Sequence, residues 1–136
     1  MHLKIITQEK VVFDSDVDEI YSKGIDGEFG ILKGHQPIMS ALDIGVTRAV
    51  VNGETKTFTT MGGILQFKNE ECLILTTLAE SGDEIDEVRA KDALERAKRR
   101  LHNAEARLDA KRAEAAIARA EARLKARLSG ESSLKM

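Results

Sequence analysis

Tryptophan is absent from this sequence, and aromatic side chains of all kinds make up only 4% of its 136 residues. Hydrophobic residues nevertheless account for 42% of the chain, which is typical of a globular protein rather than a disordered one. The core therefore has to be built mainly from Val, Ile, Leu and Met. This length predicts one domain with a single core, with room for an appendage.

Cysteine occurs once, so no disulfide can form within the chain, which fits a reducing compartment. Cys72 begins a short apolar run and has no histidine near it in sequence, so we expect a small buried side chain rather than a catalytic thiol. The sequence has no signal peptide and no apolar run of transmembrane length. We therefore expect no direct membrane insertion, and any membrane association through another protein.

Motifs that carry catalysis are also missing. The chain has no nucleophile beside a base, no zinc motif, no phosphate loop and no dinucleotide fingerprint. Its three histidines, His2, His35 and His102, are far apart in sequence, so the spacing of a metal site is absent. We expect His35 to hydrogen bond within a turn. The sequence predicts a non-catalytic protein with no metal and no obligatory cofactor.

The first 80 residues are rich in β-formers and turn signals. Four glycines and the only proline fall within residues 24–37, which predicts tight turns. Asn52 and Gly53 separate two runs of β-formers, as a type I′ hairpin requires. We expect short strands at 3–7, 11–13, 17–23, 47–51, 54–60, 64–67 and 72–78. Strands at this spacing indicate an antiparallel sandwich or a flattened barrel.

From residue 83 to residue 129 glycine and proline are both absent, and Ala, Arg, Glu and Leu dominate, which predicts helix. Ser81 and Glu84 have the spacing of a capping box, with Asp83 as an alternative cap, so we expect the helix to start at 83–86.

The apolar residues of the helical part form two stripes of different phase, namely Ala90, Leu94, Ala97, Leu101, Ala104 and Leu108, then Ala113, Ile117, Ala120, Leu124 and Leu128. The phase shift favours a break between His102 and Asp109, although no Gly or Pro forces one. Two alternatives stay open, an antiparallel pair of helices of about 17–20 residues each or one rod of about 42 residues spanning ~63 Å. Alanine stripes bury little area, about 0.8 kcal/mol per methylene, so a hairpin here closes on weak contacts.

Charge is unevenly distributed along the chain. Residues 1–79 hold 7 basic and 11 acidic side chains, whereas residues 99–127 hold 9 basic and 4 acidic ones. The basic arm favours an acidic partner, although a solvated helix face has the same composition. A nucleic-acid-binding hairpin is a further alternative, but the arm has no aromatics for stacking and its acids are interleaved, so we expect no nucleic acid.

Asp86 and Arg89 are three residues apart and can meet on one helix face, and further arginines are paired at helical spacing. Arg89 and Arg96 are seven residues apart, and Arg119 and Arg123 are four apart on the second stripe. In an antiparallel hairpin these guanidiniums converge near the Asp86 carboxylate, and a polyphosphate would neutralise them because arginine pairs with phosphate bidentately. The alternative is a local Asp86–Arg89 ion pair with solvated arginines around it.

Three stretches together, residues 27–37, the glycine pair at 62–63 and Ile85 to Ala90, resemble the ε subunit of bacterial and chloroplast F-type ATP synthases along essentially the whole chain. The family usually has Pro where this chain has Lys33, which bears on the local turn geometry. The resemblance implies an α+β fold, with an N-terminal antiparallel β-sandwich of about ten strands over 1–82 and a C-terminal α-helical hairpin over 83–136.

The resemblance also implies a non-catalytic subunit of the central stalk, peripheral to the cytoplasmic face of the cell membrane. Its sandwich would dock on the γ subunit and the c ring, with rotor contacts from Glu28, Phe29, Gly30 and His35. Its hairpin would either fold against the sandwich or extend toward the β subunits and inhibit ATP hydrolysis.

In some bacterial members the folded hairpin binds ATP as a regulatory ligand without hydrolysing it. The matching positions here are Glu80, Ile85, Asp86, Arg89, Ala90, Arg96, Arg119 and Arg123. The resemblance implies phosphate contacts from the arginines, and base or ribose hydrogen bonds from Glu80 and Asp86. The alternative is the same stalk subunit without a nucleotide site, in which the motif only caps a helix.

Overall fold

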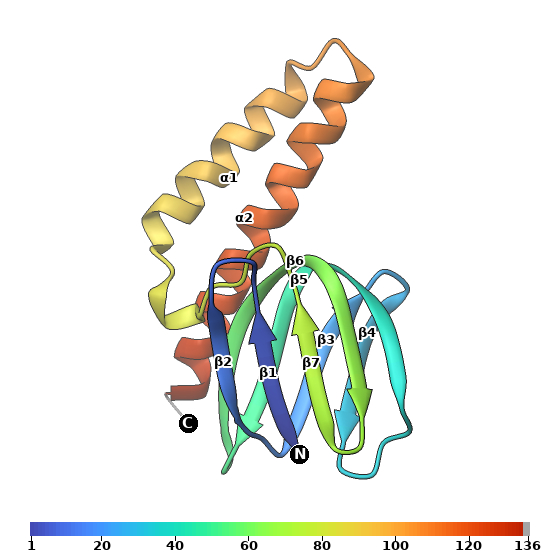
Figure 1. The fold of residues 1–136 in the computed structure, drawn as a ribbon. Helices are drawn as coiled ribbons and strands as arrows, with labels where there is room; N and C mark the ends of the chain where they lie inside the picture. The colour runs from blue at the N-terminus through green and yellow to red at the C-terminus, as the bar shows by residue number, and fades with distance from the viewer. Residues whose placement is uncertain (135–136) are drawn as a thin grey trace.

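The computed structural model describes residues 1–134, with side chains described to residue 128, and confirms the α+β fold (Figure 1). A β-sandwich comes first and a pair of helices follows. In chain order the elements are β1 (His2–Ile6), β2 (Val11–Asp16), β3 (Glu19–Gly24), β4 (Gly27–Leu32), β5 (Ile38–Val51), β6 (Glu54–Lys68), β7 (Glu71–Leu75), the 3-10 helix η1 (Gly82–Glu84), α1 (Glu87–His102) and α2 (Arg107–Leu134).

Seven strands are found among the described residues, not about ten. They form one continuous sheet in the order β2-β1-β7-β6-β5-β3-β4, which folds over on itself into two layers (Figure 1). The number is smaller because β5 and β6, of 14 and 15 residues, each run without interruption where we expected shorter strands. Gly62 and Gly63, with φ of 78° and 111°, bend β6 while its pairing with β5 continues.

The pairing is also not purely antiparallel, because β1 and β7 lie parallel, with Leu3 opposite Cys72 and Ile5 opposite Ile74. The expected hairpin between β5 and β6 is confirmed. Its two turn residues, Asn52 and Gly53, have φ of 52° and 81°, as a type I′ turn needs.

The core lies between the two layers of the sandwich. Its largest fully buried side chains are aliphatic apart from one ring, as the composition predicts: Phe67, Leu3, Ile5, Ile20, Ile31, Leu65 and Ile74. Phe13 of β2 contacts Phe58 of β6, with ring centroids 5.0 Å apart. Cys72 is buried among these residues, as predicted, and burial raises the pKa of its thiol to about 12.

The two helices form an antiparallel hairpin, which confirms the hairpin over the rod, although α2, of 28 residues, is longer than the 17–20 residues expected and α1 has 16. The turn lies between α1 and α2, and Figure 1 shows it far from the sandwich. The buried seam consists of alanines, Ala90 and Ala97 from α1 with Ala113 and Ala120 from α2. The leucines of the first stripe lie at the margins, and Leu108 is 59% exposed. Residues 135 and 136, the end of the predicted hairpin segment, lie outside the described residues.

Helix α2 attaches the hairpin to the sandwich through contacts with β5 and β6. Ala126 is fully buried beside Val46 and Ile85, and its carbonyl oxygen accepts a hydrogen bond of 2.7 Å from Thr57 Oγ1. Gly82 makes this approach possible, because a Cβ there would lie 2.3 Å from Thr57 Oγ1 and 2.6 Å from the Ala126 oxygen. In the part of the chain that the structure describes, neither helix is long and apolar enough to span a membrane.

Candidate functional site

A cleft of 440 Å³ opens at the base of the hairpin, where the chain leaves the sandwich and α1 begins. Seven of the eight residues predicted to bind ATP line it: Glu80, Ile85, Asp86, Arg89, Ala90, Arg96 and Arg123. They come from three segments, the stretch before η1, the first turns of α1, and α2. The hairpin thus brings Arg123 next to a motif more than thirty residues earlier in the sequence.

The fold does not bring Arg119 into this cleft. One helical turn separates it from Arg123, and it lines an adjoining cleft of 760 Å³ that continues toward the tip of the hairpin. Two residues that line the base cleft were not predicted, Glu84 and Ala93. Ala93 follows Arg89 by four residues on the same helix face, so the spacing carried a signal for it.

Asp86 is the N-cap of α1. Its Oδ1 accepts a hydrogen bond of 3.0 Å from the backbone N–H of Arg89, and its backbone is extended, as at most N-caps. The predicted capping box at Ser81 and Glu84 is therefore wrong, and so is the alternative cap at Asp83. Ser81 precedes only the three-residue η1, and its side chain makes no capping hydrogen bond. The interruption at Ile85 delays the start of the α-helix to Glu87.

Glu80 and Arg123 form an ion pair across the floor of the cleft. Arg123 Nε donates to Glu80 Oε1 over 2.7 Å, and the two side chains are only 27% and 32% exposed. The backbone of Glu80 is itself fixed to β6, since its N–H donates to Thr59 Oγ1 and its carbonyl accepts from the Thr59 N–H. This pair consequently ties α2 to the edge of the sandwich.

Arg89 and Arg96 are exposed on the α1 side of the cleft, and within the described residues no ion pair or side-chain hydrogen bond engages them. The Asp86–Arg89 ion pair, the alternative offered by the sequence, is absent from that set, and Asp86 Oδ1 instead accepts from the backbone N–H of Arg89. Two guanidiniums therefore face the cleft with their donors available. Such donors suit an anion with several oxygens, and phosphate is the group that arginine binds bidentately.

The residues predicted to contact the rotor lie elsewhere on the sandwich. Glu28, Phe29 and Gly30 belong to β4, an edge strand rather than a loop, and His35 lies in the turn that follows it. The His35 N–H donates to the Leu32 carbonyl, which agrees with its predicted place in a turn.

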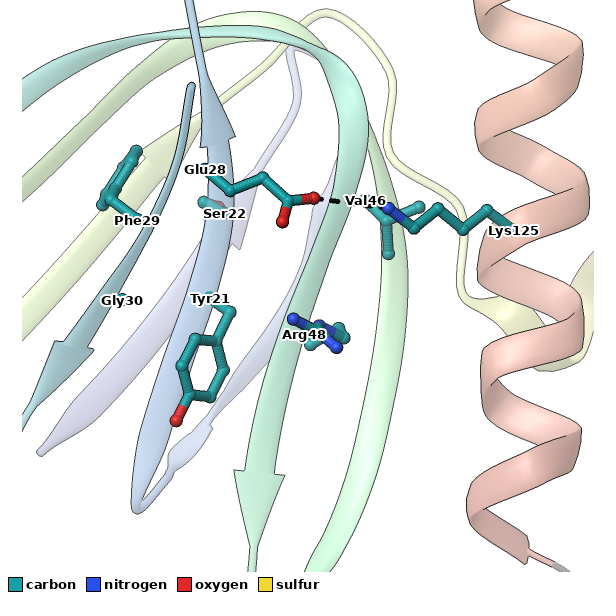
Figure 2. A pocket seen from close by; sticks show the side chains of 8 residues that line it. All are labelled: Tyr21, Ser22, Glu28, Phe29, Gly30, Val46, Arg48 and Lys125. Atoms are coloured by element: carbon teal, nitrogen blue, oxygen red, sulfur yellow. Dashed lines mark hydrogen bonds and ion pairs between the residues drawn. The ribbon is translucent and has the colours of Figure 1, made fainter. Parts of the chain in front are cut away.

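Glu28, Phe29 and Gly30 also line a pocket of 230 Å³ between β3, β4, β5 and α2 (Figure 2). Figure 2 shows Glu28 reaching toward α2, where its Oε1 lies 3.3 Å from Lys125 Nζ. On the far wall the Arg48 guanidinium lies 5.3 Å from the ring centroid of Tyr21, a cation–π contact. No group of His, Cys, Asp and Glu that could hold a metal ion is found in the described part of the chain.

Two family models match the chain. The model of the ATP synthase delta/epsilon chain β-sandwich domain covers residues 1–82, and that of the delta/epsilon chain long α-helix domain covers residues 83–127. Among solved structures, a chain of the Euglena gracilis mitochondrial ATP synthase aligns over 96% of this chain and 79% of its own length. Its TM-score is 0.79 at 22% identity, which shows a common fold.

Curated relatives extend the comparison. The ATP synthase epsilon chain of Desulforamulus reducens is 40% identical over 91% of this chain and 94% of its own. That of Carboxydothermus hydrogenoformans is 44% identical over 73% of this chain and 74% of its own. The chloroplastic epsilon chain of Nicotiana tabacum is 37% identical over 79% of this chain and 80% of its own. The chain therefore belongs to the family of ATP synthase epsilon chains.

Proposed function

We propose that this chain is a non-catalytic coupling and regulatory subunit of the central stalk of an F-type ATP synthase, and that its folded hairpin binds ATP at the base cleft as a regulatory ligand. The observation that carries the proposal is the convergence of seven predicted residues from three segments on one cleft. It resides peripherally at the cytoplasmic face of the cell membrane through its partners.

In this proposal the arginines bind the triphosphate. Arg89 and Arg96 on α1 and Arg123 on α2 face the same cleft, so they contact phosphate oxygens from both helices. Asp86 uses one oxygen to cap α1 and keeps the other to accept a ribose hydroxyl. Glu80 likewise keeps Oε2 for a hydroxyl or an amino group while Oε1 holds Arg123.

The sandwich docks on the rotor, in this proposal on the γ subunit and the c ring. A row of apolar side chains in register crosses five strands, because Val11 pairs with Ile6, Ile6 with Leu75, Leu75 with Ile64 and Ile64 with Ala41. Val11, Leu75 and Ile64 are about half exposed. In this proposal the row, an exposed apolar surface that crosses the sheet, contacts the γ subunit. In the same proposal β4 and His35 contact the c ring.

In this proposal regulation depends on two positions of the hairpin, one folded against the sandwich and one extended away from it. When the hairpin leaves the sandwich, its basic arm meets acidic loops of the β subunits and blocks ATP hydrolysis. Nucleotide bound between α1 and α2 favours the folded state. At a concentration 100 times its dissociation constant, a ligand that binds only the folded state stabilises it by about 2.7 kcal/mol. Binding at the cleft and binding to the β subunits therefore oppose each other.

A second candidate is the same stalk subunit without a nucleotide site. The observation that favours it is the capping role of Asp86, since capping alone explains an aspartate at this position. Under this alternative Arg89 and Arg96 are solvated helix residues, and ATP has no effect on the hairpin.

Calorimetric titration of the full chain with ATP separates the two. We expect micromolar binding, about −8 kcal/mol, and at least a hundredfold loss in an Arg89→Ala, Arg123→Ala variant. Lys98→Ala, Lys111→Ala is the matched control, because it removes the same charge from exposed positions outside both clefts. The absence of heat at millimolar ATP would contradict the proposal, as would equal losses in the two variants.

A further inference from the structure

The cleft at the base of the hairpin continues beyond the residues proposed to bind the triphosphate. On α1 the residues that line it continue into the adjoining cleft at spacings of four and three, as Arg89, Ala93, Arg96, Arg100 and Asn103. Residues so spaced lie on one face of a helix. The two clefts therefore follow each other along the same face of α1.

Helix α2 shows the same arrangement in the opposite direction. Arg123 lines the base cleft, and Arg119, Ala116, Arg112 and Asp109 line the cleft toward the tip, again at spacings of four and three. Both helices consequently present one continuous face to a single groove, which we call the hairpin groove. From Arg89 to Asn103 it extends about 21 Å at 1.5 Å per residue, longer than the phosphate tail of a nucleotide.

Positive charge lines the whole hairpin groove. The seven arginines that line it are Arg89, Arg96, Arg99 and Arg100 from α1 and Arg112, Arg119 and Arg123 from α2. Within the described residues only Arg123 has a carboxylate partner. The lining carboxylates are gathered at the two ends, Glu80, Glu84 and Asp86 at the base and Glu105 and Asp109 at the tip. The middle of the groove is left with guanidiniums alone.

The shape of the groove selects among anions. Its lining includes Ala93, Ala113 and Ala116, small side chains that let a slender ligand lie close to both helices. Arginines stand on both walls, so a ligand with phosphate oxygens on all sides is contacted from both helices. A linear condensed phosphate has this form, because each unit carries charge and none carries a side chain. An acidic peptide fits less well, because its carboxylates are carried on flexible side chains that lose conformational entropy when they are ordered on binding.

We propose that the hairpin groove binds linear polyphosphate chains longer than a triphosphate, whether free or attached to a nucleoside. The chain spans from Arg89 and Arg123 at the base to Arg100 and Arg112 at the tip. The lower part of the groove is shared with the proposed nucleotide site, so polyphosphate and ATP compete there. Each added arginine–phosphate contact is charge-assisted, and affinity consequently rises with chain length until the groove is filled.

Calorimetric titration of the full chain with tripolyphosphate and with long-chain inorganic polyphosphate tests the proposal. We expect the long chain to bind at least tenfold more tightly per site than tripolyphosphate. Arg100→Ala, Arg112→Ala removes this gain and leaves tripolyphosphate binding within about threefold of wild type, because both substitutions lie at the tip. Lys98→Ala, Lys111→Ala, of equal charge change but outside the groove, keeps the gain.

Equal affinity for the two phosphates would overturn the proposal, and so would equal losses in the tip variant and the lysine control, which indicate unspecific charge attraction. Polyglutamate that bound as tightly as long-chain polyphosphate would overturn it in favour of an acidic peptide. ATP titrated against the same samples keeps the two proposals apart. ATP binding without a chain-length gain would contradict only the proposal of an extended polyphosphate groove. A chain-length gain without ATP binding would contradict only the proposed nucleotide site.

Discussion

The Nε of Arg123 on α2 donates to the Oε1 of Glu80 across 2.7 Å, and this ion pair joins the hairpin to the last extended residues of the sandwich. Both side chains are about two-thirds buried or more, so the pair is better shielded than the exposed Lys91–Glu87 pair on α1, whose lysine is 62% exposed. We infer that Glu80 and Arg123 contribute to holding the hairpin folded.

Replacing Arg123 with Ala should lower the free energy of unfolding by about 1 kcal/mol, since Glu80 loses its charged hydrogen-bond partner. Urea unfolding of Arg123→Ala, Glu80→Ala and the double variant gives the coupling between the two residues. Lys91→Ala is the control, with a change of at most about 0.5 kcal/mol. A coupling indistinguishable from zero would show that the pair does not hold the hairpin.

Gly82→Ala should detach α2 from the sandwich. The added Cβ would lie 2.3 Å from Thr57 Oγ1 and 2.6 Å from the Ala126 oxygen, two atoms already joined by a hydrogen bond. Overpacking of this kind costs about 1–3 kcal/mol. Limited trypsin digestion measures it, because detachment exposes the arginines of α2 and speeds cleavage there. Ser81→Ala, next in sequence and without a capping hydrogen bond, should digest at the wild-type rate, and an equal rate for Gly82→Ala would refute the steric account.

Substitutions at Asp86 separate its capping role from a role in binding. Asp86→Asn keeps an oxygen for the Arg89 N–H, so the free energy of unfolding should stay close to wild type, whereas Asp86→Ala should lose about 1 kcal/mol. If the carboxylate also binds ribose, Asp86→Asn weakens ATP binding without reducing helix content by circular dichroism. Normal ATP affinity in Asp86→Asn would leave the residue a cap alone.

Stability should fall as the pH rises above about 6.5 because of His2. Its ring nitrogens contact Asp14 and Asp16 on β2, and the hydrogen bonds to Asp16 and then Asp14 raise the pKa of His2 above its ordinary value. A raised folded-state pKa stabilises the protein below the unfolded-state value, and this contribution is lost as the pH passes the folded-state pKa. Histidine NMR should place the midpoint above 6.5, and Asp14→Asn, Asp16→Asn should lower it; an unchanged midpoint in that variant would contradict the assignment.

Local signals in the sequence predicted much of the fold. The Asn52–Gly53 turn was predictable because few other residues accept positive φ at two successive positions, and the helical hairpin because its two apolar stripes differ in phase. The length of β5 and β6 was not predictable in the same way. The glycines at 62 and 63 read as a strand end, whereas they serve as a bend inside β6, with Gly63 too close to the Leu75 oxygen for any side chain.

The candidate site was predicted in its residues but not in its arrangement. Helix spacing relates Arg89 to Arg96 and Arg119 to Arg123, yet only the register of the hairpin decides that Arg123 lines the cleft with Asp86 and that Arg119 does not. The start of α1 was misjudged because a capping box at Ser81 and the cap at Asp86 are both compatible with the sequence. Gly82 is buried against Thr57 and Ala126, and these tertiary contacts hold the segment after Ser81 in a 3-10 turn.

Hydrogen exchange of the full chain with and without ATP tests most directly whether nucleotide holds the hairpin folded. At 100 times the dissociation constant, amides of α1 and α2 that exchange through the detached state should slow about a hundredfold, which corresponds to about 2.7 kcal/mol, while those of β1 to β7 stay unchanged. The Arg89→Ala, Arg123→Ala variant should show no slowing. Unchanged exchange in the helices of the wild type, under conditions where calorimetry detects bound ATP, would contradict the account.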